Sequence, residues 1–194
     1  GILLADADKE LEEFINFMQI PVAHSLMGKG ALRDDHPLLM GMTGFWGTKL
    51  VNQNCLKADY ILALGKRFKE ADCSSWYNGY TFNIPPSKII HIDIDPSEIG
   101  RNYPTEIGAV ADLKNALKIL LERAKIKFPK VKDNSKKIKE IISFKANFIK
   151  KNKKMAESKK FPMMPERILS DLRKAIPNDA IITTDVGWNK NGVG

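Results

Sequence analysis

The stretch Lys88-Ile89-Ile90-His91-Ile92-Asp93-Ile94 is the clearest strand signal in the sequence. It is mostly apolar on both faces, as a central strand of a parallel sheet must be. A second apolar run, 60–64, ends at Gly65, and we expect shorter strands over 20–25 and 107–111. Short strands at this spacing leave room for one helix or loop between each pair.

Segments of helical periodicity lie between these strands. Leu11, Phe14, Ile15 and Met18 recur on one face of a helix. Strands that alternate with helices predict a doubly wound α/β domain with a parallel sheet and right-handed crossovers, a Rossmann-like arrangement. The expected helices cover 6–18, 48–57 with Thr48 as N-cap, and 113–124 with Asp112 as N-cap, and we expect loops over 26–47 and 66–87.

The net charge of +8 is concentrated in one part of the chain. Residues 125–160 contain 14 Lys and three acids, so the rest of the chain carries a charge of −3. We therefore exclude a uniformly basic nucleic-acid binder, and we favour a solvated connector over a phosphate-binding tract because Arg and aromatic residues are scarce there. The 43% hydrophobic content excludes a chain that is disordered throughout.

The cysteines and histidines indicate neither a disulfide scaffold nor a metal site. Cys55 and Cys73 are too few, and His24, His36 and His91 are scattered. No apolar run approaches the ~20 residues that cross a bilayer, and no signal peptide opens the chain. We predict a soluble, cytoplasmic protein with no metal-ligating residues, and both ends look cut from a longer chain.

The composition divides the chain into three parts. We expect a nucleotide-binding-like domain over 1–125, a lysine-rich helical linker over 126–160 that packs on a domain surface, and the start of a second α/β domain over 161–194. In the last part, a helix should begin at Pro165, and a strand should cover 179–184. The expected buried face of that helix consists of Ile168, Leu169, Leu172 and Ile176.

Ligand-binding residue types follow several of the expected strands. They are a glycine-rich loop at 41–48, Gly65 with Arg67, and Asp93. Ligands enter open α/β sheets at the carboxyl ends of the strands, so these residues predict a crevice for a ribose and phosphate ligand. Two simpler interpretations stay open: the glycines only make a tight turn, and Asp93 and Asp95 only cap the turn before Pro96. We find no catalytic constellation, and His91 fits the core better than an active site.

Several runs of the sequence resemble the central domain of thiamine-diphosphate-dependent enzymes. They are IPVAHSLMGKG (20–30), KADYILALG (57–65) and IHIDIDPSEIG (90–100), together with 36–38, 41–48 and 110–112. The resemblance is closest to the large subunit of acetolactate (acetohydroxyacid) synthase. The run DAIITTDVG (179–187) looks like the first strand of that family's pyrophosphate-binding domain. Together these runs cover most of 1–125 in the family's order.

The resemblance implies a fragment of a larger enzyme. Such enzymes contain pyrimidine-binding, central and pyrophosphate-binding domains, hold thiamine diphosphate and Mg²⁺, and form homodimers or homotetramers. They decarboxylate a 2-keto acid such as pyruvate and pass the bound unit to an acceptor. The implied partners are therefore the missing domains, a second copy and a small keto acid, with no nucleic acid or membrane. The chain alone should be inactive, with no catalytic residue of its own.

The resemblance also implies FAD as a structural cofactor of the central domain, although other family members hold ADP there or nothing. Two departures favour the alternatives: Trp46 stands where the family has His, and 69–71 reads Lys-Glu-Ala instead of Asp-Asp-Arg. Rival interpretations are a non-enzymatic nucleotide-binding domain of the sirtuin type and a structural scaffold. The implied cofactor-binding residues are Ser25, Leu26, Met27, Thr43, Gly44, Phe45, Trp46, Gly65, Arg67, Asp93, Ile94, Ala111 and Asp112, and, for the diphosphate, Gly187, Trp188 and Asn189.

Overall fold

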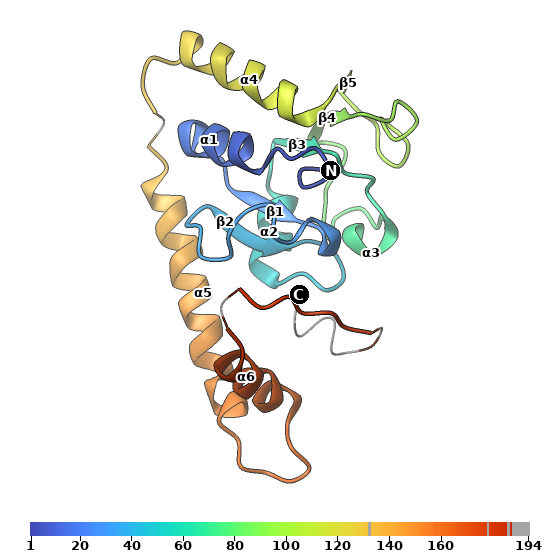
Figure 1. The fold of residues 1–194 in the computed structure, drawn as a ribbon. Helices are drawn as coiled ribbons and strands as arrows, with labels where there is room; N and C mark the ends of the chain where they lie inside the picture. The colour runs from blue at the N-terminus through green and yellow to red at the C-terminus, as the bar shows by residue number, and fades with distance from the viewer. Residues whose placement is uncertain (132, 178, 186, 188–194) are drawn as a thin grey trace. The chain divides into compact units, whose positions relative to one another are not determined.

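The computed structural model describes residues 1–131, 133–177, 179–185 and 187. The chain forms two compact units, residues 1–141 and 142–194. The first unit holds all the strands of the described chain and the first two turns of the long helix α5 (Ser135–Ala156) (Figure 1). The second holds the rest of α5 and the helix α6 (Pro165–Ala175).

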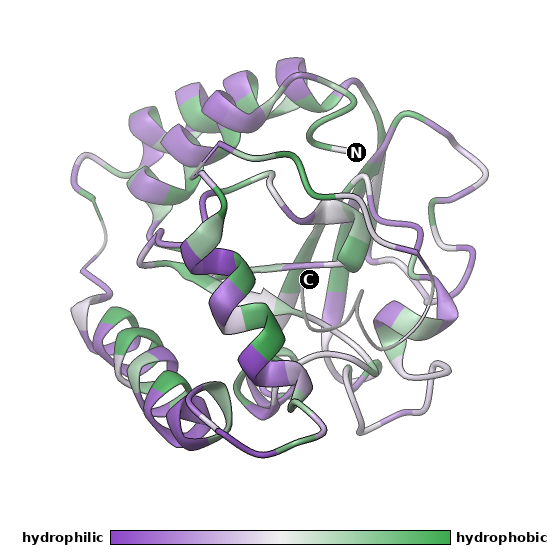
Figure 2. Cartoon of the chain, turned by 60° about the horizontal axis from the view of Figure 1, so that its bottom comes forward, coloured by the Kyte–Doolittle hydropathy of each residue, from purple (hydrophilic) through white to green (hydrophobic). Residues whose placement is uncertain are grey.

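Every strand pair in the first unit is parallel, as predicted. The strand β4 (Lys88–Asp93) lies between β3 (Tyr60–Leu64) and β5 (Ile107–Val110), and β1 (Val22–His24) pairs with β2 (Leu39–Met42) in a second sheet. The strands are mostly apolar in Figure 2. The α/β fold class is therefore confirmed.

Strand β2 and two short helical turns lie where only loops were predicted. A 3-10 turn, η1 (Leu26–Gly28), and β2 occupy part of 26–47, and the helix α3 (Glu70–Cys73) lies within 66–87. The glycines and prolines around β2 suggest a loop, but its pairing with β1 and the burial of Leu39 and Met42 make it a strand. Nearby partners override local propensity here.

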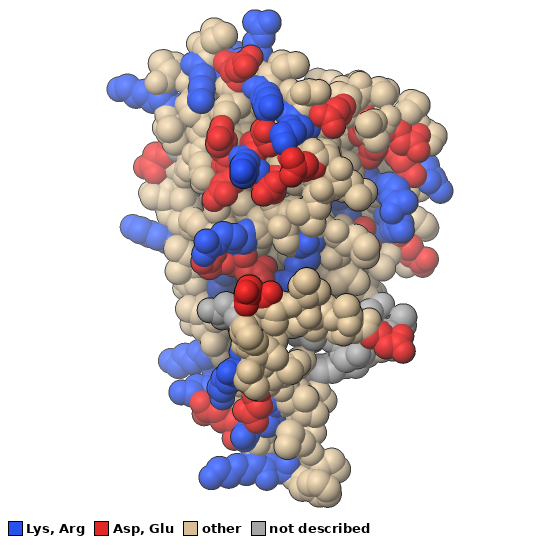
Figure 3. Space-filling model, viewed as in Figure 1, with Lys and Arg blue, Asp and Glu red and all other residues tan. Residues whose placement is uncertain are grey.

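The helix α1 (Asp8–Met18) packs on α4 (Leu113–Lys127). Its predicted face is buried at Leu11, Phe14 and Ile15 and partly buried at Met18, in a core shared with Ile92 of β4 and Leu117 of α4. Acidic and basic side chains mix over these two helices in Figure 3, and the pair Lys114–Asp6 spans 2.7 Å. The first unit has no uniformly basic surface on this side.

Of the two predicted N-caps, only one makes its cap bond. The Asp112 carboxylate accepts a 3.0 Å bond from the amide of Asn115 at the start of α4, as predicted. Thr48 precedes α2 (Lys49–Leu56), but its hydroxyl caps nothing, and the buried Oγ1 has no partner among the described residues. The prediction for the Thr48 side chain was wrong, although its position before the helix was right.

The start of α5 belongs to the first unit. Ile141 is fully buried in a second core with Val51, Phe68 and Ile89. Just before α5, the side chain of Asn134 donates a 2.8 Å hydrogen bond to the carbonyl of Gln19. The compact unit therefore extends beyond residue 125, because apolar packing and a hydrogen bond attach the beginning of α5 to it.

The second unit departs from the expected buried helix and strand. Pro165 begins α6 as predicted, but no residue of α6 is buried, and Ile168 and Leu172 are 50% and 40% exposed. The described residues of 179–185 form no strand, because none of them pairs with a neighbouring strand, which regular β-structure needs.

None of the described helices is long and apolar enough to cross a membrane.

Candidate functional site

The carboxyl ends of β3, β4 and β5 lie side by side. The amide of Gly65 donates a 2.8 Å hydrogen bond to the carbonyl of Ile92, and the amide of Ala111 donates a 3.0 Å bond to the carbonyl of Asp93. Parallel pairing continues to these positions, with Leu64 opposite Ile92. The structure therefore brings Gly65, Asp93 and Ala111 together at one edge, with Asp112 directly after Ala111.

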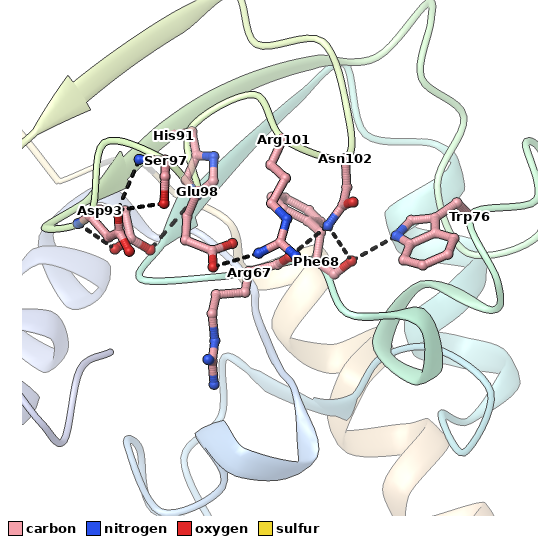
Figure 4. Close-up of polar contacts among 10 residues, drawn as sticks. Arg67, Phe68, Trp76, His91, Asp93, Ser97, Glu98, Arg101 and Asn102 are labelled. Carbon is pink, nitrogen blue, oxygen red and sulfur yellow. Dashed lines mark hydrogen bonds and ion pairs between the residues drawn. The ribbon is translucent and has the colours of Figure 1, made fainter.

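Two adjacent basic residues, Lys66 and Arg67, follow Gly65 at the end of β3, and they differ in their ion pairing. The ammonium of Lys66 lies 3.1 Å from the carboxylate of Asp72, and both side chains are largely buried. Arg67 is exposed, makes no ion pair with a described residue, and points away from Glu98 and Arg101 in Figure 4. The Arg67 guanidinium is therefore available to an anion, whereas the Lys66 ammonium is already paired.

The carboxylates after β4 stabilise the local turn. Asp93 is buried, and its Oδ1 accepts a 3.0 Å bond from the amide of Asp95. Asp95 in turn accepts bonds from the hydroxyl and the amide of Ser97, which hold the pKa of Asp95 below its usual value. Both carboxylates therefore cap this turn, while Ile94 between them is exposed.

His91 is a core residue, as the sequence indicates. It is 1% exposed, and its Nε2 lies 4.0 Å from Asp93 Oδ2 without a hydrogen-bond partner among the described residues. Burial lowers its pKa, although the nearby carboxylates of Asp93 and Glu98 oppose that shift. At neutral pH the imidazole is therefore uncharged.

The glycines of the loop after β2 serve chain packing. A Cβ atom on Gly44 would lie 2.2 Å from the carbonyl oxygen of Ala71, and one on Gly47 would lie 2.5 Å from that of Met42. The side chain of Asn52 in α2 also bonds to both the amide and the carbonyl of Gly44. The tight-turn interpretation therefore accounts for these glycines without a ligand.

The loops after β1 and β2 are joined. The amide of Thr43, which is buried, donates a 2.9 Å bond to the carbonyl of His24, just before Ser25. Phe45 and Trp46 are exposed, with ring centroids 4.8 Å apart in an edge-to-face pair. Ser25 and Leu26 are half-buried, and Met27 is 82% exposed. Because Gly44 packs on Ala71, these loops also meet the segment that follows β3.

The remaining implied site residues are those of the C-terminal part of the chain. Gly187 belongs to the second compact unit, and Trp188 and Asn189 lie outside the described residues. Two polar residues at the edge, Trp76 and Asn102, were missed by the sequence analysis; both donate to the carbonyl of Phe68. No sequence pattern could have revealed these bonds, because they join residues 8 and 34 positions apart.

The described residues provide neither a metal site nor a reactive thiol. They contain no group of three or more His, Cys, Asp or Glu residues that could hold a metal ion. Cys55 and Cys73 are free and buried, and burial raises the pKa of each to about 11. Among the implied site residues, Arg67, Phe45 and Trp46 are exposed and could contact a ligand.

Comparison with known proteins gives consistent matches. The family described as "Thiamine pyrophosphate enzyme, central domain" matches residues 1–120. A probable acetolactate synthase large subunit of Methanocaldococcus jannaschii is 36% identical over 196 residues, which cover 98% of this chain and 32% of the relative. A glyoxylate carboligase of Escherichia coli O157:H7 is 30% identical over 193 residues, which cover 98% of this chain and 31% of the relative. The chain spans about a third of the length of these relatives.

Proposed function

Because this chain belongs to the thiamine pyrophosphate enzyme family, through that family's central domain, we propose that the whole protein is a thiamine-diphosphate-dependent carboligase. It decarboxylates a 2-keto acid such as pyruvate and transfers the remaining unit to an acceptor, as an acetolactate synthase-like enzyme. The similarity to acetolactate synthases and to a glyoxylate carboligase over nearly all of the chain supports this proposal.

Thiamine diphosphate, held with Mg²⁺, supplies the electron sink for such a reaction when it is bound. The described residues offer no metal-binding cluster, so the proposal assigns both groups to other parts of the full protein and to the region of Gly187, Trp188 and Asn189. The chain alone should therefore be inactive. The proposal includes a homodimer or homotetramer in the cytoplasm, which is compatible with two unpaired cysteines.

For this segment we propose nucleotide binding at the carboxyl edge of β3, β4 and β5, with FAD or ADP as the ligand. The observation that carries it is the convergence of Gly65, Asp93 and Ala111, followed in the chain after Gly65 by the exposed Arg67. Arg67 would bind the phosphates, and the exposed rings of Phe45 and Trp46 suit a planar base or flavin. The other residues proposed for this site are Ser25, Leu26, Met27, Thr43, Gly44, Ile94 and Asp112.

A second candidate role, a scaffold without a nucleotide, also has a specific observation in its favour. The backbone of Ala71 and Asp72 fills the space beside Gly44, and the turn after β4 uses the Asp93 carboxylate. Both features reduce the number of groups left for a ligand. The two roles differ in one measurable property, the affinity of the folded protein for FAD and ADP.

Thermal unfolding of the full-length protein with FAD and with ADP tests the nucleotide role. A ligand that binds only the folded state raises Tm, and the shift should shrink in Arg67→Gln. Arg123→Gln is the matched control, because Arg123 is an exposed arginine of α4, away from the strand ends in sequence. If neither nucleotide raises Tm at concentrations far above micromolar, the nucleotide role is contradicted and the scaffold role is favoured.

The carboligase role is tested separately. The full-length protein, supplied with thiamine diphosphate and Mg²⁺, should consume pyruvate or another 2-keto acid and release carbon dioxide. A protein that is folded and saturated with thiamine diphosphate but releases no carbon dioxide from a panel of 2-keto acids would contradict this part of the proposal. The nucleotide result does not depend on this outcome.

A further inference from the structure

Phe68, which directly follows Arg67, has an unusual backbone conformation. Its φ angle is +47°, in the left-handed region that residues with a bulky side chain rarely adopt. Such a conformation persists only where the surrounding structure holds it in place. The contacts that hold Phe68 therefore also determine where the backbone leaves β3 and where Arg67 stands.

The ring of Phe68 is held in the core of the first unit. It is buried, and it makes edge-to-face contacts with Phe82, His91 and Tyr103 at centroid distances of 5.8, 5.5 and 5.4 Å. These three aromatic partners come from separate parts of the chain. The ring cannot turn without disturbing the packing around it.

The carbonyl groups on either side of this position are held by two polar side chains (Figure 4). Trp76 Nε1 donates a 2.7 Å hydrogen bond to the carbonyl of Phe68. Asn102 Nδ2 donates to the carbonyls of both Arg67 and Phe68, at 2.9 and 3.2 Å. The two donors thus fix the peptide groups that flank the left-handed residue.

The loop that carries Trp76 is itself tightly bent. Ser74, Ser75 and Trp76 all have φ angles between +52° and +57°. The Ser74 hydroxyl is hydrogen bonded to that of Thr81 at 2.7 Å, and Ser75 donates to Glu70 at 3.1 Å. Three consecutive left-handed residues bring the indole N–H to Phe68, although the indole itself is partly exposed.

We propose that Trp76 and Asn102 are positioning residues for Arg67: by holding the Arg67–Phe68 peptide groups, they fix the guanidinium where it binds the phosphate groups of a nucleotide. This inference rests on the nucleotide role proposed above. Arg67 is exposed and has no ion-pair partner among the described residues, whereas Lys66 is paired with Asp72, so the direction of the backbone at 67–68 decides where the Arg67 guanidinium is presented.

The test compares ADP and FAD affinity, measured by calorimetry, among variants of the full-length protein. Trp76→Phe keeps an aromatic ring but removes the N–H donor, and Asn102→Ala independently removes the other donor. Each should weaken binding by about two- to tenfold, the usual range for one lost hydrogen bond. Tyr77→Phe, an exposed aromatic residue of the same loop, is the matched control and should leave affinity unchanged.

A double-mutant cycle separates positioning from a general loss of stability. In an Arg67→Gln background, Trp76→Phe should cause no further loss of affinity, because the residue through which Trp76 acts is already gone. A purely structural role would weaken binding equally in both backgrounds, and that result would overturn the inference. So would a folded Trp76→Phe or Asn102→Ala protein that binds as tightly as the wild type.

The failure of this inference can be distinguished from failure of the nucleotide role. If the wild type binds ADP or FAD and Arg67→Gln weakens binding, but neither Trp76→Phe nor Asn102→Ala does, only the positioning role is wrong. If the wild type binds neither nucleotide, the nucleotide role is wrong and the positioning role is rejected with it.

Discussion

The backbone N–H of Phe45 donates a hydrogen bond of 2.8 Å to the carbonyl oxygen of Ala71. This bond joins the loop after β2 to α3, and it needs a close approach of two backbones. The approach is possible because Gly44 has no side chain. A side chain at position 44 would therefore collide with the backbone of Ala71, in addition to any strain from the positive φ angle.

Gly44→Ala should destabilise the chain more than Gly79→Ala. Both glycines have positive φ angles, +87° and +81°, so both variants suffer backbone strain. Only at position 44 does the new Cβ meet backbone atoms, whereas nothing lies within 4 Å at position 79. We expect an additional loss of about 1–3 kcal/mol at position 44, measured by denaturant unfolding. Equal losses would show that the packing against Ala71 is unimportant.

Asp112→Ala should lower the free energy of unfolding by about 1 kcal/mol, because it removes the side-chain cap of α4. Thr48→Ala, at the equivalent position before α2, is the matched comparison. Its hydroxyl makes no cap bond, so the change should stay within about 0.5 kcal/mol. Urea unfolding of both variants checks the pair, and a larger loss in Thr48→Ala would contradict the structure of the α2 start.

His91 should make the chain less stable in mild acid. Burial holds the pKa of His91 below its ordinary 6.5. In mild acid, His91 therefore binds a proton more readily in the unfolded chain than in the folded chain. Stability should therefore fall as the pH drops below about 6.5, by at most about 1.4 kcal/mol per pH unit, the limit for one proton. Unfolding curves between pH 7 and 5 measure the slope.

The control for this pH effect is His91→Gln, which keeps a polar side chain but cannot titrate. Its stability should change less steeply over the same pH range, whatever its absolute stability. The groups that face His91 include Asp93 and Glu98, and both remain in the variant. Identical slopes in the two proteins would mean that His91 does not titrate differently on folding.

Cys55 and Cys73 should react very slowly with iodoacetamide in the folded protein. Burial raises the pKa of each to about 11, against the weaker opposing effect of Lys66, so at pH 8 only about one thiol in a thousand is ionised. Mass spectrometry of labelled peptides gives the extent of reaction. Both cysteines should label readily in guanidinium chloride, and fast labelling of either one without denaturant would refute their burial.

The parts of the fold that sequence could predict are those determined by local pattern. The apolar run at 60–64 and the helical face of Leu11, Phe14 and Ile15 are visible in the sequence because each element carries its own periodicity. The strand β2 was missed because it depends on β1 beside it. The strand predicted over 179–184 did not form for the corresponding reason: its described residues have no partner strand.

For the candidate site, the sequence could predict which residues follow the strands but not the contacts between the loops. Strand-end residues such as Gly65 and Asp93 could be expected at one edge, because parallel pairing brings the carboxyl ends together. The sequence could not show that Ala71 fills the space beside Gly44, or that Trp76 bonds to the Phe68 carbonyl. Both are contacts between loops, and no periodicity in the sequence encodes them.

The uninterrupted parallel register of β3, β4 and β5 has a consequence for how this domain can diverge. Each loop at the carboxyl edge is attached to its own strand, so a loop can be replaced while the strands keep their pairing. The Lys-Glu-Ala sequence at 69–71, which differs from the motif expected there, lies beyond β3 at the start of α3. Natural variation can therefore change the segments at this edge one at a time while the strands keep their pairing.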